Sequence, residues 1–114
     1  MVVTQGDVFW HDFAEPKGSE PGYTRPVAVV QGDHLNRAKI GTAVCVILTS
    51  NVRMASAAGN VLLPKKSTGL EFDSVANVSQ IATVDRDLLR DHTGRLPPSK
   101  LEAVLRGIDV VLGR

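Results

Sequence analysis

The sequence predicts a mainly β fold with a helical end: a small, strongly bent antiparallel sheet or barrel followed by a C-terminal helix. Five segments within residues 7–84 show strand patterns, either alternating apolar and polar residues or nearly unbroken apolar runs. Residues 99–114 instead repeat apolar side chains at helical spacing. With 114 residues, 43% of them hydrophobic, residues 1–114 are expected to form a single domain with a substantial core.

The first two expected strands are residues 7–13 and residues 25–31. The alternation in the first assigns its side chains to two faces, Val8, Trp10 and Asp12 against Phe9, His11 and Phe13. In the second strand, Pro26 can stand only at the beginning because it has no N–H group for a ladder.

Residues 42–50 are a nearly unbroken apolar run, typical of a central strand that is covered on both faces. Residues 60–64 and 74–84 are expected to add further strands, and the second is long enough to bend or split in two. Residues 65–73 between them are expected to be a loop.

The C-terminal helix is expected to begin at Ser99, because Ser99 and Glu102 have the spacing of a capping box and follow Pro97 and Pro98. A single apolar stripe should pack this helix on the sheet, comprising Leu101, Val104, Leu105, Ile108, Val111 and Leu112. A shorter helix is expected to begin at Asp85, with the aspartate as its cap.

The charge balance and the hydropathy restrict the possible partners. A formal net charge of +1 gives no global field for nucleic acid, so such a partner must be bound locally. The longest apolar run is far shorter than the roughly 20 residues that a membrane span needs. The N-terminal residues MVVTQGD lack the pattern of a secretory signal. A cytoplasmic protein without membrane contact is therefore expected.

Neither a metal site nor a cofactor is expected from the composition. His11, His34 and His92 are scattered along the chain without metal-ligand spacing, and there is no second cysteine to support a cluster. The lone Cys45 lies inside the apolar run AVCVIL, which favours a small core residue over a nucleophile.

Three polar residues are candidates for phosphate chemistry. Arg25 precedes a proline, which favours an extended backbone at the mouth of a strand, and its planar guanidinium suits a phosphate. The alternative is a surface arginine paired with Glu15 or Glu20. Thr49 and Ser50 follow the buried strand, where a rigid sheet could present their hydroxyls to a phosphate. The alternative there is an ordinary turn.

Five blocks follow one another along the chain: GDVFWHDF, GSEPGYTRPVAVVQ, VILTSN, DSVANVSQIATVDRDLL and the terminal helix. In the second block, the pattern Gly-Ser-Glu, a short glycine-bearing spacer and Arg-Pro is formed by Gly18, Ser19, Glu20, Gly22, Arg25 and Pro26. Together these blocks resemble the MazF/PemK family of toxin endoribonucleases over nearly the whole chain.

This resemblance implies an SH3-like barrel of the CcdB/PemK type, a homodimer, and metal-independent cleavage of single-stranded RNA at short sequences. The target would be mRNA, with rRNA and tRNA as further candidates, and cleavage would inhibit translation and growth. The ribose 2′-hydroxyl would attack the adjacent phosphate, leaving a 2′,3′-cyclic phosphate and a 5′-hydroxyl. Arg25 would stabilise the phosphorane or protonate the leaving oxygen. Thr49 would hold a nonbridging oxygen or assist the 2′-hydroxyl.

The resemblance also implies an RNA-binding surface, for which the candidates are Ser19, Glu20, Tyr23, Ser50, Asn77 and Gln80. Tyr23 could stack on a base or only pin its loop, and the other side chains could equally satisfy local loop groups. Asn77 and Ser79 stand where some members of the family carry an acidic residue, and Ser19 stands where some carry a histidine. The identity of the general base therefore stays open.

The family further implies a MazE-like antitoxin, whose acidic tail could lie across Arg25, Lys65 and Lys66. Two other function classes compete with the toxin ribonuclease. A noncatalytic, CcdB-like gyrase inhibitor would act through the terminal helix, but IDVVLGR offers no aromatic anchor. A peptide-binding module of SH3-like shape needs clustered aromatic residues, and only 4% of this chain is aromatic.

Overall fold

The computed structural model describes residues 2–15, 18–19 and 22–114. In chain order the elements within these residues are β1 (Asp7–Asp12), β2 (Thr24–Val29), α1 (Asp33–Asn36), β3 (Thr42–Thr49), η1 (Val52–Ser56), β4 (Val61–Leu63), α2 (Lys65–Thr68), β5 (Ser74–Asp85), η2 (Arg86–Leu88), β6 (Arg90–Arg95) and α3 (Pro98–Leu112). The labels η1 and η2 denote short 3₁₀ helices.

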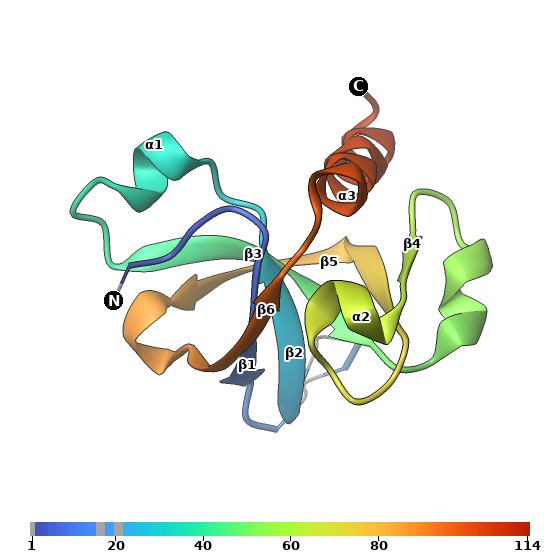
Figure 1. Cartoon of the computed structure of the whole chain (residues 1–114), viewed down its shortest axis with the longest axis horizontal. Coiled ribbons are helices and arrows are strands. Elements are labelled where there is room, and N and C mark those ends of the chain that lie inside the picture. Colours follow the sequence, from blue (N-terminus) through green and yellow to red (C-terminus); the bar gives the residue numbers. More distant parts are fainter. Residues whose placement is uncertain (1, 16–17, 20–21) are drawn as a thin grey trace.

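The described strands form one antiparallel sheet, which curves into a half-barrel with α3 against it (Figure 1). Their order across the sheet is β4-β5-β3-β2-β1-β6. The predicted mainly β fold with a C-terminal helix is therefore confirmed. The run of residues 42–50 is also confirmed as a central strand, because β3 lies between β2 and β5.

The curved sheet separates two apolar clusters, one on each face. The first core cluster consists of Val3, Phe9, Val27, Val29, Ala43, Cys45, Ile47, Val84 and Leu89. The second core cluster consists of Val8, Ala28, Val46, Leu48, Leu63, Ala76, Val78, Leu96 and Val104. Alternate residues of β3 enter each cluster, so the prediction that both of its faces are covered is confirmed. The alternation in β1 is confirmed in the same way, since Val8 and Phe9 enter different clusters.

The long strand β5 bends where it pairs with the middle of β3. Val46 pairs with Ile81, whereas the next residue, Ile47, pairs with Asn77. The intervening residues 78–80 have no partner on β3, and such a bulge kinks a strand and increases its twist. The predicted bend in residues 74–84 is therefore confirmed.

The helix α3 packs on the second core cluster through Leu101, Val104 and Ile108. The predicted capping box is wrong, because α3 already begins at Pro98 and no side chain caps its N-terminus. The fixed φ of a proline suits the first helical position, and this places Ser99 inside the first turn rather than at its cap.

The predicted apolar stripe is only partly buried. Val111 and Leu112 are 42% and 59% exposed, because the last turn of α3 projects beyond the sheet (Figure 1). These two residues were expected to pack on the sheet and do not.

Three short elements differ from the sequence-based expectations. The helix expected from Asp85 is the single 3₁₀ turn η2, although Asp85 does cap it by accepting the Asp87 N–H at 2.9 Å. The expected loop of residues 65–73 contains α2, which ends at the left-handed Gly69. Strand β6 was not predicted, because RDHTGR lies mostly exposed at the sheet edge and lacks an apolar alternation. None of the helices in the described part of the chain is long and apolar enough to cross a bilayer.

Candidate functional site

Arg25 and Thr49 lie on neighbouring strands at the same level of the sheet. In the antiparallel pair of β2 and β3, Val27 is opposite Ile47, and continuing this register by two residues places Arg25 opposite Thr49. On the other side, Arg25 is paired directly with His11 of β1. Since opposite residues of antiparallel strands point to the same face, these three side chains form one row across β1, β2 and β3. This row is termed the polar row below.

The Arg25 side chain is exposed, and its only hydrogen bond within the described residues is weak. Its Nε–H group donates to the Gly22 carbonyl oxygen at 3.3 Å. Among the described carboxylates none forms an ion pair with Arg25, so a surface pair with Glu15 is not present. Glu20, the other suggested partner, lies outside the described residues. Most donors of the guanidinium are therefore available to an anionic ligand.

Thr49 is the last residue of β3, and its hydroxyl serves a local turn. The Oγ1 atom accepts the Asn51 N–H at 3.2 Å, and the Asn51 Oδ1 atom in turn accepts the Arg53 N–H at 3.3 Å. The alternative of an ordinary turn is therefore correct for the acceptor role of the Thr49 hydroxyl. A hydroxyl has one donor and two acceptor sites, so this turn leaves the Thr49 O–H free to donate to a phosphate oxygen.

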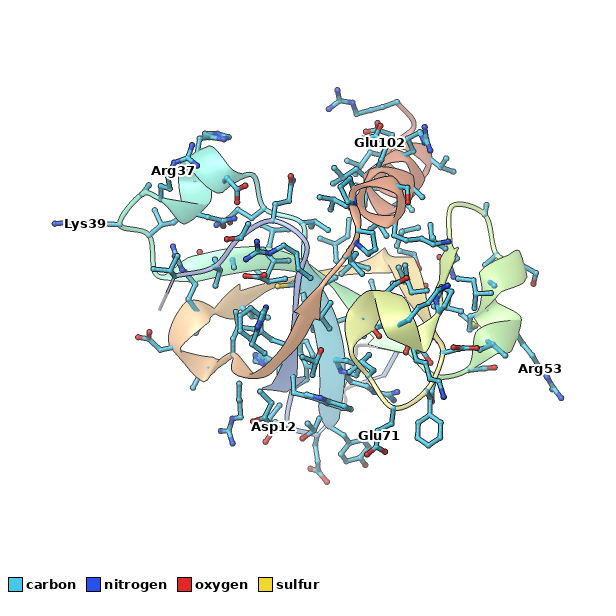
Figure 2. All side chains as sticks on the ribbon, in the orientation of Figure 1. Asp12, Arg37, Lys39, Arg53, Glu71 and Glu102 are labelled. Atoms are coloured by element: carbon cyan, nitrogen blue, oxygen red, sulfur yellow. The ribbon has the colours of Figure 1, made fainter. Side chains whose placement is uncertain are left out.

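A cavity of about 300 Å³ opens beside Arg25. Its lining combines aromatic and aliphatic surfaces with hydroxyls and one carboxylate, from Trp10, Thr24, Arg25, Pro26, Leu48, Ser50, Leu70, Glu71, Phe72 and Ser74. Glu71 lies at the lower edge of the molecule in Figure 2. Such a mixture of apolar walls and a few polar groups suits a flat ring with hydrogen-bonding edges. Ser50, which sequence reasoning selected, lines this cavity, whereas Trp10 and Phe72 were not selected.

The candidates between β1 and β2 are only partly described. Ser19 is exposed, and Glu20 lies outside the described residues. Tyr23 has a left-handed backbone with φ of 59°. Its N–H donates to the Ala14 carbonyl at 2.5 Å, and its carbonyl accepts the Phe13 N–H at 2.9 Å. The backbone of Tyr23 therefore holds the connection, and its ring, in a residue that is 61% exposed, is available for stacking.

Asn77 borders the β5 bulge and Gln80 lies within it, and their side chains bond to each other. The Asn77 Nδ2 atom donates to Gln80 Oε1 at 3.1 Å, and Asn77 Oδ1 accepts the Ser79 hydroxyl at 3.2 Å. Asn77 is buried and opposite Ile47, so its side chain is on the same face as Thr49, two residues along β3. The hydrogen-bonding groups of the Asn77 side-chain amide are largely occupied by Gln80 and Ser79. A contact of Asn77 with RNA stays a prediction.

His11 is a member of the polar row that sequence reasoning did not select. Its ring stacks on Phe13 with centroids 4.4 Å apart, and its Nδ1 atom is buried without a partner among the described residues. Burial lowers the pKa of His11, the charge of Arg90 lowers it further, and Asp12 opposes the shift. The imidazole is therefore neutral near pH 7. The signal that could have found it was the alternation of DVFWHDF, which assigns His11 to one face of its strand, together with antiparallel pairing to the strand of Arg25.

Cys45 is fully buried, and this burial raises the pKa of its thiol to about 12. Its prediction as a core residue is confirmed, because a thiol that stays protonated is a poor nucleophile. Across residues 2–15, 18–19 and 22–114, no group of three or more His, Cys, Asp or Glu side chains is placed to hold a metal ion.

Comparisons with known proteins match this fold along almost its full length. Residues 4–112 match the family model described as PemK-like, MazF-like toxin of type II toxin–antitoxin system. Endoribonuclease MazF2 of Mycobacterium bovis is 39% identical over 112 residues, covering 98% of each chain. Endoribonuclease EndoA of Bacillus subtilis is 34% identical over 112 residues, covering 98% of this chain and 96% of the relative.

Solved structures share the same fold. MazF of Deinococcus radiodurans superimposes with a TM-score of 0.80 at 23% identity, covering 100% of this chain and 99% of the other. A mycobacterial endoribonuclease solved in complex with its cognate antitoxin gives a TM-score of 0.79 at 22% identity, covering 97% and 95%. The family model and the curated relatives confirm the resemblance drawn from the five sequence blocks. The chain belongs to the PemK-like, MazF-like toxin family of type II toxin–antitoxin systems.

Proposed function

We propose that this protein is a toxin endoribonuclease that cleaves single-stranded RNA at short sequences without a metal ion. The observation that carries the proposal is the placement of Arg25 and Thr49 on one face of adjacent strands. Arg25 also borders a cavity suited to a planar ring, whose other strand residues, such as Trp10 and Leu48, belong to the opposite face of the sheet. The curated relatives named endoribonucleases support the same reaction. Inhibition of translation and growth would follow from the cutting of mRNA, with rRNA and tRNA as further candidate targets.

The reaction is an in-line transesterification within the RNA. The ribose 2′-oxygen bonds to the adjacent phosphorus while the bond from phosphorus to the 5′-oxygen breaks, which gives a 2′,3′-cyclic phosphate and a 5′-hydroxyl. The proton lost by the 2′-hydroxyl passes to a base, and an acid supplies a proton to the 5′-oxygen. Arg25 places a permanent positive charge against the phosphorane, and Thr49 donates its O–H to a nonbridging oxygen.

Recognition of the RNA requires unstacked bases, because an edge of a base is read only when the base leaves its stack. The cavity beside Arg25 can accept one base between aromatic and apolar walls, with Trp10 and Phe72 offering stacking surface. Ser50 and Glu71 offer hydrogen bonds to its edge. Tyr23 has an exposed ring for a neighbouring base. Ser19, Glu20, Asn77 and Gln80 complete the proposed RNA-binding set on the basis of the family pattern.

The proposal includes a homodimer, a MazE-like antitoxin and a cytoplasmic location. Apolar side chains at the end of α3 support a dimer, since Val110, Val111 and Leu112 are between 42% and 59% exposed. Lys65 and Lys66 in α2 are exposed cations on which an acidic antitoxin tail could lie. Size-exclusion chromatography with light scattering should give twice the monomer mass at micromolar concentration. A monomer would contradict the dimer.

The gyrase-inhibitor alternative is not favoured, because the family model and the curated relatives are toxins and endoribonucleases of the MazF type. A peptide-binding module is the least supported alternative. Of the chain's five aromatic residues, Phe9 is in the core and His11 covers one face of Phe13. Too few remain for a proline-peptide groove.

The test uses purified protein and a long unstructured RNA in the presence of EDTA, with mapping of both new ends. Cleavage should give 2′,3′-cyclic phosphate and 5′-hydroxyl ends. Arg25→Ala should lower kcat/KM by about 10²- to 10³-fold, as for loss of an oxyanion donor. The matched control Arg53→Ala removes an exposed arginine of η1 and should cut like wild type. No cleavage by the wild type, or equal cleavage by Arg25→Ala, would contradict the proposal.

A further inference from the structure

His11 and Arg25 are directly opposite each other on β1 and β2. At such a position in an antiparallel pair, the Cβ atoms are about 4.5–5.5 Å apart and the side chains share one face. The two side chains therefore leave the backbone next to each other on that face. Their proximity follows from the register and requires no movement of the sheet.

The imidazole of His11 is both buried and unsatisfied. The residue is 7% exposed, and its Nδ1 atom has no hydrogen-bond partner among the described residues. Nine in ten or more of buried polar groups have a partner. A buried nitrogen without one carries a free-energy penalty, so its retention beside a candidate catalytic residue calls for a functional reason.

The charged and titratable groups around His11 come from three strands. Asp12 follows it on β1, Arg25 faces it from β2, and Arg90 of β6 is paired with the preceding residue, Trp10. Burial lowers the pKa of His11, Asp12 opposes this shift and Arg90 adds to it, which leaves the ring neutral near pH 7 with one nitrogen as an acceptor. Arg25 has the complementary property, because within the described residues its guanidinium makes only the 3.3 Å bond to Gly22.

We propose that His11 is a positioning residue for Arg25: its neutral imidazole accepts an N–H of the Arg25 guanidinium when RNA is bound. This bond would replace the long bond to Gly22 and aim the remaining N–H groups at the scissile phosphate. Protonation of His11 would remove the acceptor and place a second cation beside Arg25. The inference rests on the proposed function, since it assigns Arg25 the role of phosphate ligand.

The kinetic test compares wild type, His11→Gln and His11→Leu from pH 5 to pH 8.5, after each variant is shown to be folded. His11→Leu should lower kcat by about 10- to 100-fold with little change in KM, since a misplaced catalytic group costs this much. His11→Gln keeps a neutral acceptor, so it should retain most of kcat and lose the wild-type decline at acid pH. The control His34→Gln, at an exposed histidine of α1, should keep that decline.

An independent measurement does not depend on cleavage. In ¹⁵N NMR spectra of the intact protein with an all-DNA oligonucleotide, the Arg25 Nε–Hε signal should move in step with the titration of the His11 ring, whereas the Arg53 signal should not. If the wild type cuts no RNA, the proposed function fails, and this titration alone decides the His11–Arg25 contact. If the wild type cuts RNA but His11→Leu matches its kcat and pH profile, the inference is wrong while the function stands.

Discussion

Asp7 of β1 and Arg95 of β6 are paired across the sheet edge, with the Asp7 Oδ1 atom 2.8 Å from the Arg95 Nε atom. The same carboxylate oxygen is 3.1 Å from His92 Nε2, and its other oxygen accepts the Thr4 N–H at 2.8 Å. Asp7 is 3% exposed. One buried carboxylate thus joins the N-terminal segment, β1 and the edge strand β6.

Asp7→Ala should lower the free energy of unfolding by about 1–3 kcal/mol, because it leaves the Thr4 N–H without its acceptor and Arg95 without its counterion. Urea unfolding followed by circular dichroism measures this loss. The control Asp109→Ala removes an exposed carboxylate that is 3.8 Å from Arg114, and it should change stability by less than about 0.5 kcal/mol. Equal stability of Asp7→Ala and wild type would show that the cluster contributes nothing.

The edge strand β6 also illustrates a limit of prediction from the sequence. Residues 42–50 were predicted correctly because a strand covered on both faces must be apolar throughout. Strand β6 has no such constraint, since its residues are mostly exposed and its pairing depends on the distant Asp7 and Val8. The pattern of residues within one short segment cannot predict its pairing with a segment more than 80 residues away.

The candidate site likewise contains some residues that the sequence reveals and others that it does not. Arg25 and Thr49 were accessible to sequence reasoning because each stands at a recognisable strand boundary. His11 and Phe72 were not, because His11 matters through its cross-strand register with Arg25, and Phe72 through the loop after α2, which lines one cavity together with residues of β2. Glu20 lies outside the described residues, so its role stays a prediction from the family pattern.

Gly107→Ala should destabilise the protein by distorting the contact of α3 with the loop before β4. A Cβ atom on Gly107 would overlap the carbonyl oxygen of Gly59 and come within 3.1 Å of Val78. Because backbone cannot be moved as cheaply as a side chain, a loss of about 1–3 kcal/mol is expected in place of the usual gain from replacing a helical glycine. Thermal unfolding measures the change. Arg106→Ala, at the exposed preceding residue, is the control, and a gain in Tm for Gly107→Ala would refute the close contact.

Asp33 is expected to make stability depend on acid pH. Its Oδ1 atom accepts the Gln5 N–H at 2.8 Å and the Asn36 Nδ2–H at 3.1 Å. The backbone bond from Gln5, followed by that from Asn36, lowers the pKa of Asp33 below its usual 3.8. A lowered carboxyl pKa means that the charged form stabilises the fold above pH 3.8, and that this stability is lost as the pH falls through the folded-state pKa.

Asp33→Asn should therefore be less stable than wild type at pH 7, and the difference should shrink steadily below pH 3.8. Urea unfolding at a series of pH values gives the curve. Glu102→Gln is a suitable control, because Glu102 is an exposed residue on α3, and it should show no comparable convergence (Figure 2). A difference between Asp33→Asn and wild type that is independent of pH would assign the effect to packing rather than to charge.

Phe72 is expected to supply binding energy for one base of the RNA. It is 68% exposed on the wall of the cavity next to Arg25, and stacking of a base on an aromatic ring contributes about 1–3 kcal/mol. Phe72→Ala should therefore raise KM about 5- to 150-fold, with kcat changed much less because Phe72 does not touch the reacting phosphate. Phe72→Trp should restore binding, since a larger ring preserves the stacking surface.

Leu88→Ala removes a 52% exposed apolar side chain on η2, away from the cavity lining, and controls for general loss of apolar surface. Unchanged KM for Phe72→Ala on every RNA that the wild type cuts would remove the base from this cavity and leave Arg25 and Thr49 to act without it.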